Sequence, residues 1–113
     1  MNVQIFGTKK SFDSKKAERY FKERGIKYQF VDMKEKGLSK WEFHSVCQAV
    51  GGYEKLIDPK CKDKNLLALI QYLSEEDKKE KILENQKIIR TPIVRNGKQA
   101  TVGYEPDVWK DWK

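Results

Sequence analysis

The chain has 113 residues, of which 38% are hydrophobic and 36% charged, and its net charge is +7 at pH 7. This length predicts a single domain, and the apolar content is enough for a compact core, which argues against a disordered chain. Lysine is mixed with glutamate along the chain, which favours a solvated surface over direct nucleic-acid binding. The apolar runs are too short to span a bilayer and no signal-peptide segment is evident, so we expect a cytoplasmic protein with no membrane partner.

The N-terminal part of the chain predicts a β-α-β unit. Val3 to Phe6 is a short apolar segment that predicts a strand, and Ser11 to Arg24 predicts a helix that ends at Gly25. Tyr28 to Val31 is rich in aromatic and β-branched residues, which predicts a second strand. A helical crossover between neighbouring strands makes them parallel, so we expect a parallel pair with a right-handed connection.

The middle of the chain, from about residue 37 to 88, predicts a helical insertion within the same domain. Ser39 is suited to cap one helix, which Gly51 and Gly52 would end, and Ser74 is suited to cap a later helix. The segment NLLALIQYL carries apolar residues at helical spacing, namely Leu66, Leu69, Ile70 and Leu73.

The last third of the chain predicts a β-hairpin and a short helix. In TPIVRNGKQATVG, two β-rich segments flank Asn96 and Gly97, a pair suited to the positive φ angles of a tight turn. Pro106 is suited to the first turn of a C-terminal helix. The apolar face of that helix would consist of Val108, Trp109 and Trp112.

The two cysteines and the single histidine do not predict a metal site or a disulfide framework, because they are few and widely spaced. Cys47 shares a helical apolar stripe with Phe43, so we expect a small core residue there. His44 lies off that stripe and is expected to be exposed or half-exposed. Cys61 lies between two lysines and is either a reactive thiol or an ordinary surface or packed cysteine.

The order of these elements resembles the thioredoxin-like fold, an α/β fold with a small mixed sheet. A helical insertion between the two halves is typical of the arsenate-reductase-related family, which includes ArsC-like and Spx-like proteins. The resemblance covers nearly the whole chain. It rests on FGTKKSFDSKKA after the first strand, KGLS after the second, and the later TPIV and VGY segments.

In this resemblance, Ser11 occupies the position of the family's nucleophilic cysteine, and Ser14 a position that holds a second cysteine or another small residue. A thiolate at a helix N-terminus is stabilised by free backbone N–H groups and the helix dipole. A serine hydroxyl is scarcely ionised at neutral pH, and the local sequence offers no general base. The resemblance therefore implies a thiol-disulfide oxidoreductase that is inactive with Ser11 at this position.

Three interpretations of Ser11 stay open. Its residue type and its place before a helix both suit an N-cap. It also fits a natural family member that lost the nucleophile and now binds without reacting. The third interpretation is a chain in which the cysteine has been replaced by serine, and the retained Lys10 and the small Ser14 favour it.

The other half of the family site is a proline that follows a cis peptide bond, and Pro92 matches that position. The resemblance implies that the backbone of Thr91 pairs with an extended thiol peptide such as glutathione; the alternative is a trans proline that opens an edge strand. The implied co-substrate is glutathione, with a small thiol or disulfide substrate and a thiol-reducing protein as partners, and no bound cofactor. The residues expected to line the site are Lys10, Ser11, Ser14, Thr91 and Pro92, with Arg90 as a further contributor.

Arsenate reductases of this family hold the oxyanion with arginines, and this sequence departs from that pattern. Thr91 occupies the position of the arginine expected immediately before the proline. Arg90 lies one residue earlier, and in an extended segment its side chain would therefore point to the opposite face. The other expected arginines align with Asp58 and Gln99. Since a bidentate arginine clamp makes an oxyanion site selective, the sequence disfavours arsenate reduction.

The rival hypothesis is an Spx-like regulatory module that binds RNA polymerase or another protein. Spx-type proteins usually carry a cysteine pair at the positions of Ser11 and Ser14 and are longer at the C-terminus. We therefore rank this hypothesis second.

Overall fold

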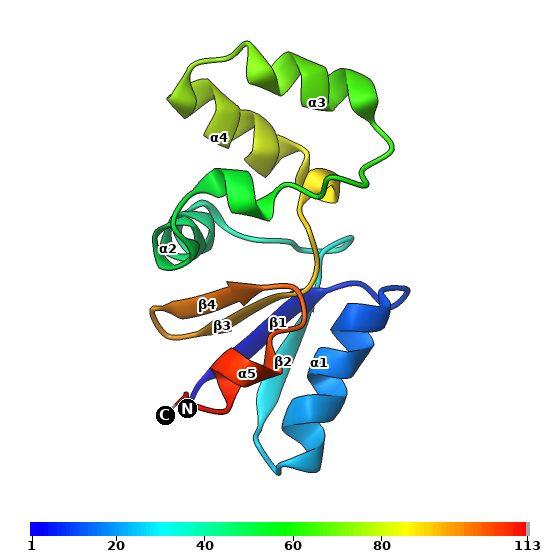
Figure 1. The fold of residues 1–113 in the computed structure, drawn as a ribbon, viewed down its shortest axis with the longest axis vertical. Helices are drawn as coiled ribbons and strands as arrows, with labels where there is room; N and C mark the ends of the chain where they lie inside the picture. The colour runs from blue at the N-terminus through cyan, green and yellow to red at the C-terminus, as the bar shows by residue number, and fades with distance from the viewer. Residues whose placement is uncertain (113) are drawn as a thin grey trace.

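The computed structural model describes residues 1–112 (Figure 1). In chain order its elements are β1 (Val3–Gly7), α1 (Phe12–Glu23), β2 (Tyr28–Asp32), α2 (Lys40–Val50), the 3-10 helix η1 (Tyr53–Leu56), α3 (Lys64–Gln71), α4 (Glu75–Glu84), the 3-10 helix η2 (Gln86–Ile88), β3 (Ile93–Asn96), β4 (Gln99–Val102) and α5 (Pro106–Trp109). This order confirms the predicted sequence of β-α-β unit, helices, hairpin and C-terminal helix. The two 3-10 helices were not predicted.

The four strands form one mixed sheet in the order β2-β1-β3-β4. β1 and β2 are parallel, with Val3 opposite Tyr28, as the β-α-β prediction requires. β3 is antiparallel to β1, with Ile93 opposite Phe6, and β4 is antiparallel to β3. The two central strands therefore come from opposite halves of the chain, and β2 and β4 form the edges.

Helices α1 and α5 cover one face of the sheet (Figure 1). Strand residues such as Ile5 and Val94 pack there against an aromatic cluster. The cluster consists of Tyr20, Phe21, Trp109 and Trp112. The Trp109 indole N–H donates a hydrogen bond of 2.7 Å to Thr101 Oγ1, so this buried polar group is satisfied.

The helical insertion covers the other face. Phe6 and Ile93 of the central strands share one apolar cluster with Phe43 of α2, Leu56 of η1 and Ile82 of α4. In Figure 1, α3 and α4 lie farthest from the sheet, beyond α2, which gives the molecule extents of 44 × 26 × 24 Å. Within residues 1–112, no helix is long and apolar enough to cross a membrane.

The helix ends agree with the predicted caps. Ser39 Oγ accepts from the Glu42 N–H at 3.1 Å, and Glu42 Oε1 accepts from the Ser39 N–H at 2.9 Å, which forms a capping box. Gly51 ends α2 at a φ of 91°, where a side chain would be strained. Ser74 Oγ caps α4 through the Asp77 N–H at 3.3 Å.

The predicted position of the hairpin turn is wrong. Asn96 pairs with Gln99, so the hairpin turn consists of Gly97 and Lys98, one residue later than predicted. Of these two turn residues, only Gly97 has a positive φ, of 61°, which glycine adopts without steric strain because it has no Cβ. The helix predicted from the apolar spacing of NLLALIQYL is α3, in which Ile70 is buried and Leu69 is 46% exposed.

Candidate functional site

The loop between β1 and α1, residues 8–11, is called the first loop here. Ser11 is the N-cap of α1, with extended backbone angles of φ −81° and ψ 122°. Its Oγ accepts from the Ser14 N–H at 3.2 Å, and its own N–H donates to the Thr8 carbonyl at 3.2 Å. The capping interpretation of Ser11 is therefore confirmed, and its side chain is half-buried at the mouth of the helix.

Ser14 supports the first loop from below. Its side chain is fully buried, and its Oγ accepts a hydrogen bond of 3.3 Å from the Thr8 N–H. A Cβ on Gly7 would collide with Ser14 Oγ, so β1 can approach α1 this closely only with glycine at position 7. The prediction that Ser14 contacts substrate conflicts with this burial, because its hydroxyl faces the loop backbone.

Pro92 lies beside the first loop. The Thr91–Pro92 peptide bond is cis, as expected. Ile93, the residue after Pro92, pairs with Phe6 at the end of the antiparallel β1–β3 ladder, one residue before β1 ends at Gly7. The Pro92 carbonyl accepts from the Gly103 N–H at 2.8 Å, which holds this segment to the chain after β4.

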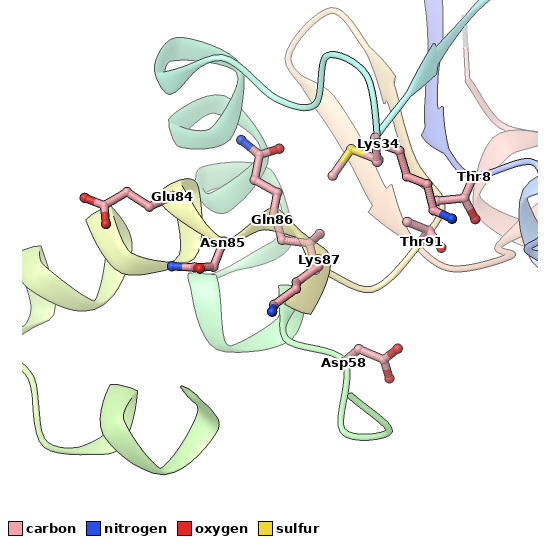
Figure 2. A pocket seen from close by; sticks show the side chains of 10 residues that line it. Thr8, Lys34, Asp58, Glu84, Asn85, Gln86, Lys87 and Thr91 are labelled. Carbon is pink, nitrogen blue, oxygen red and sulfur yellow. The ribbon is translucent and has the colours of Figure 1, made fainter. Parts of the chain in front are cut away.

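Thr8 and Thr91 line one cleft with a volume of about 520 Å³, which we call the Thr8–Thr91 cleft. Its other lining residues are Met33, Lys34, Asp58, Glu84, Asn85, Gln86, Lys87 and Ile89. Figure 2 shows the Lys34 side chain extending toward Thr8 and Thr91, with Asp58 and Lys87 farther along the cleft. The cleft thus lies where the loops after β1 and β2 meet the start of β3.

Hydrogen bonds at both ends of the insertion fix the far wall of the cleft. The Gln86 side chain accepts from the Leu38 N–H at 2.7 Å and donates to the Leu38 carbonyl at 2.8 Å. The Asp58 N–H donates to the Ile88 carbonyl at 2.8 Å, next to a β-bridge between Ile57 and Ile89. These bonds join segments far apart in sequence, so the wall is positioned by tertiary contacts.

The sequence model of one protein family, described as the ArsC family, matches residues 6–112. The chain belongs to the ArsC family. A search of curated proteins finds no match. The resemblance predicted from the first loop and the Thr91–Pro92 segment is therefore confirmed at the level of the family.

Solved structures agree with this family. An arsenate reductase from Vibrio cholerae is 25% identical with a TM-score of 0.82, covering 96% of this chain and 94% of that one. A candidate ArsC-family-related protein from Bacteroides fragilis is 19% identical with a TM-score of 0.86, covering 100% and 98%. A candidate arsenate reductase from Yersinia pestis is 22% identical with a TM-score of 0.84, covering 97% and 99%. The fold is thioredoxin-like, as predicted.

The charges in the cleft of this ArsC-family chain are mixed. Lys87 Nζ lies 3.2 Å from Asp63 Oδ2, whereas Lys34 makes no ion pair within residues 1–112. Asp58, which aligns with an arginine expected from the family pattern, places a carboxylate in the cleft, and its Oδ1 accepts from the Lys60 N–H at 2.9 Å. The prediction against arsenate reduction rests on this replacement of an expected arginine by Asp58, and it stays a prediction.

Arg90 does not join this group. A terminal guanidinium nitrogen of Arg90 lies 3.2 Å from the position that a Cβ on Gly103 would take, and the side chain lines a different hollow, beside β4. Lys10 is exposed on the first loop and does not line the cleft. Of the predicted residues, only Thr91 lines the cleft. Ser11 is hydrogen-bonded to the cleft residue Thr8, and Pro92 follows Thr91 in the chain, so the prediction that these residues form one site stays a prediction.

Sequence reasoning missed Thr8, Lys34 and Gln86 as cleft residues. A signal for Lys34 was present, because parallel strands place the loops after their carboxyl ends side by side, and Lys34 follows β2 as Thr8 follows β1. Gln86 gave no such signal, since its partner Leu38 lies 48 residues away.

Neither cysteine lies at the first loop. Cys47 is buried in the cluster under the insertion, and this burial raises the pKa of its thiol to about 11, against a smaller opposing effect of Lys79. Cys61 is half-buried and packs against the same cluster. Within residues 1–112, no three His, Cys, Asp or Glu side chains come together to hold a metal ion.

Proposed function

We propose that this ArsC-family protein binds a small anionic thiol compound, glutathione or its disulfide, in the Thr8–Thr91 cleft. We propose further that it does not turn the compound over while Ser11 occupies the nucleophile position. Its chemistry with a cysteine at that position would be thiol-disulfide exchange.

The observation that carries this proposal is the state of Ser11. Its hydroxyl caps α1 at the position that the family resemblance assigns to the nucleophile. Attack on a disulfide sulfur requires a thiolate, and the two thiols of the chain lie in the cluster under the insertion. The single histidine, His44, is exposed on α2, and within residues 1–112 the hydrogen bonds of Ser11 go to Thr8, Ser14 and Lys15, so no hydrogen-bonded base activates its hydroxyl.

Two features of the cleft support a thiol peptide as ligand. Lys34 supplies a cation without an ion-pair partner within residues 1–112, which suits a peptide carboxylate. The hydrogen bonds among those residues include none to the backbone N–H or C=O of Thr91. These groups are therefore free to pair with an extended peptide backbone, as in strand addition.

The test compares the chain carrying Cys61→Ser with the same chain carrying Ser11→Cys in addition. An aromatic disulfide is added and released thiolate is measured. With Ser11, we expect no release above the buffer rate. In Ser11→Cys, the new thiolate attacks one sulfur, the S–S bond breaks, and one aromatic thiolate leaves for each mixed disulfide formed.

Glutathione binding is measured separately by amide chemical shifts of the serine form. We expect shifts at Thr8, Lys34 and Thr91 with reduced glutathione and with its disulfide. Turnover by the Ser11 form that disappears in Ser11→Ala would contradict the proposal, as would shifts confined to residues outside the cleft.

The Spx-like alternative stays a prediction. No contact within residues 1–112 favours RNA polymerase over other partners, and the test is a pull-down with the intact chain. Stoichiometric capture of polymerase subunits would favour regulation over thiol chemistry.

A further inference from the structure

β4 is an edge strand with one unpaired side. It pairs with β3 alone, at the end of the strand order. In this two-residue hairpin, the pairs of Asn96 with Gln99 and of Val94 with Thr101 exchange backbone hydrogen bonds, and the Gly103 N–H continues the ladder to Pro92. The backbone N–H and C=O groups between these bonded positions, at residues 100 and 102, therefore point away from the sheet.

A hollow of about 560 Å³ follows this free edge. Ala100 and Val102 line it and pack on the α2 side of the sheet. Thr101 also lines it, although its side chain lies on the α5 side, where Trp109 binds it. Since residues from both faces of β4 contribute, the hollow runs along the strand edge and does not lie over one face. We call it the β4 groove.

Apolar side chains form part of both walls of the β4 groove. Val50, at the end of α2, is half-buried on one side, and Val108 of α5 is 42% exposed on the other. Figure 1 shows α2 and α5 on opposite sides of β4. The strand itself, QATV, contains none of the lysines or prolines with which proteins usually protect an edge.

The cations of the groove are without ion-pair partners. Lys55 and Arg90 line it, and neither makes an ion pair within residues 1–112. Arg90 lies against Gly103, at the end of β4, and Lys55 lies against Gly51, at the end of α2. Glu105 is the single acidic residue that lines the groove. An added strand would therefore meet a positive potential along the α2 wall.

We propose that the β4 groove binds an extended acidic segment of a partner protein by strand addition. The N–H and C=O groups of residues 100 and 102 would pair with its backbone, and alternate side chains would face the two walls. Acidic side chains would lie toward Lys55 and Arg90, and apolar ones toward Val108. A second copy of this chain fits less well, because it carries a net charge of +7 and would bring like cations together.

The probe is a short peptide that alternates glutamate and valine, with a fluorescent label. Binding is followed by anisotropy, and amide hydrogen exchange locates it. We expect slower exchange of the Ala100 and Val102 amides, which the peptide backbone would engage. The Thr101 amide should not change, because it is already bonded to β3.

Two variants test the charge and the backbone. Lys55→Gln with Arg90→Gln should weaken binding about tenfold, the combined effect of two exposed ion pairs. Lys22→Gln with Lys64→Gln removes the same charge from exposed positions outside the groove and should leave binding unchanged. Ala100→Pro removes an outward N–H that β3 does not use and should abolish binding with the fold intact.

Three results would overturn the proposal. One is equal binding of the peptide in which lysine replaces glutamate. Another is exchange that slows at β2, the opposite edge, and not at β4. The third is sedimentation as a dimer whose Ala100 and Val102 amides are protected without peptide, which would assign the groove to a second copy of the chain.

Discussion

At the scale of single residues, Ser14 joins helix α1 to the first loop. Its buried Oγ accepts from the Thr8 N–H, and its own N–H donates to Ser11 Oγ. Ser14→Ala leaves the partly buried Thr8 N–H without this partner, which should cost about 1 kcal/mol of unfolding free energy. Urea denaturation measures this cost. Ser11→Ala, which removes only the cap, should cost about 1 kcal/mol. No loss of stability in Ser14→Ala would contradict the supporting role.

Lys34 is the residue on which the anionic ligand of the proposed site depends. Lys34→Gln should weaken glutathione binding to the Ser11 form about threefold, because it removes one exposed charge pair. Lys36→Gln is the matched control, since Lys36 is exposed on the same loop but does not line the cleft. A titration followed by amide shifts measures both. Equal weakening by the two changes would show that only net charge matters.

Single residues were predicted best where local chemistry decides. Ser11 was predicted as a cap because a serine before an amphipathic helix can cap it through local hydrogen bonds, which do not depend on tertiary contacts. Ser14 was placed among the substrate contacts because sequence does not distinguish a buried hydroxyl from an exposed one. The burial of Ser14 depends on Gly7 of β1, because only glycine at that position lets β1 approach α1 so closely.

At the scale of elements, Tyr53 connects η1 to α4. It is 5% exposed, and its hydroxyl donates to Glu75 Oε1 at 3.1 Å. Burial, and then the bond to Glu75, raise the pKa of Tyr53 to about 12. Because the folded pKa exceeds the ordinary value of about 10, the neutral phenol stabilises the fold fully below pH 10. This contribution is lost as the pH rises through about 12.

Tyr53→Phe tests this connection. As the pH rises from about 10 to the folded pKa of Tyr53, the urea midpoint of the native chain should decrease. Part of that decrease should be absent from the variant. Tyr72→Phe is the control, because Tyr72 is 86% exposed and makes no such bond. Parallel pH curves for all three proteins would contradict the assignment.

The elements themselves were predictable where a cap or turn residue marks them. Ser39 and Ser74 located two helix starts, and Gly97 located the hairpin to within one residue. The turn was placed too early because Asn-Gly is the commonest pair at two-residue turns, whereas here Asn96 is the last strand residue. Helical periodicity predicted α3 but does not say how much of the helix its neighbours cover, and Leu69 is 46% exposed.

At the scale of the whole molecule, the insertion shares its core with the sheet. Phe6 and Ile93 of the strands pack in one cluster with Leu56 and Ile82 of the insertion. We therefore expect the chain to unfold in one transition. Trp109 and Trp112 lie on the opposite face of the sheet, so their fluorescence reports that side. In a Trp41→Phe background, which removes the exposed indole, the fluorescence and far-ultraviolet circular dichroism midpoints in urea should coincide. Separate midpoints would show an insertion that unfolds alone.

The arrangement of the whole molecule followed from the sequence only through element order and family resemblance. The order gave the mixed sheet and the place of the insertion, which the topology bears out. The cleft did not follow, because its walls are joined by bonds such as that of Gln86 with Leu38, 48 residues apart. Such pairings carry no local sequence signal.

The central claim is that the first loop and the start of α1 form a thiolate site that Ser11 leaves without a nucleophile. The most direct test is the rate of alkylation of Ser11→Cys against pH, in a Cys61→Ser background. Free N–H groups and the dipole of α1 should lower the pKa of the new thiol well below the ordinary value of about 8.5. A thiol that titrates at the ordinary value would contradict the claim.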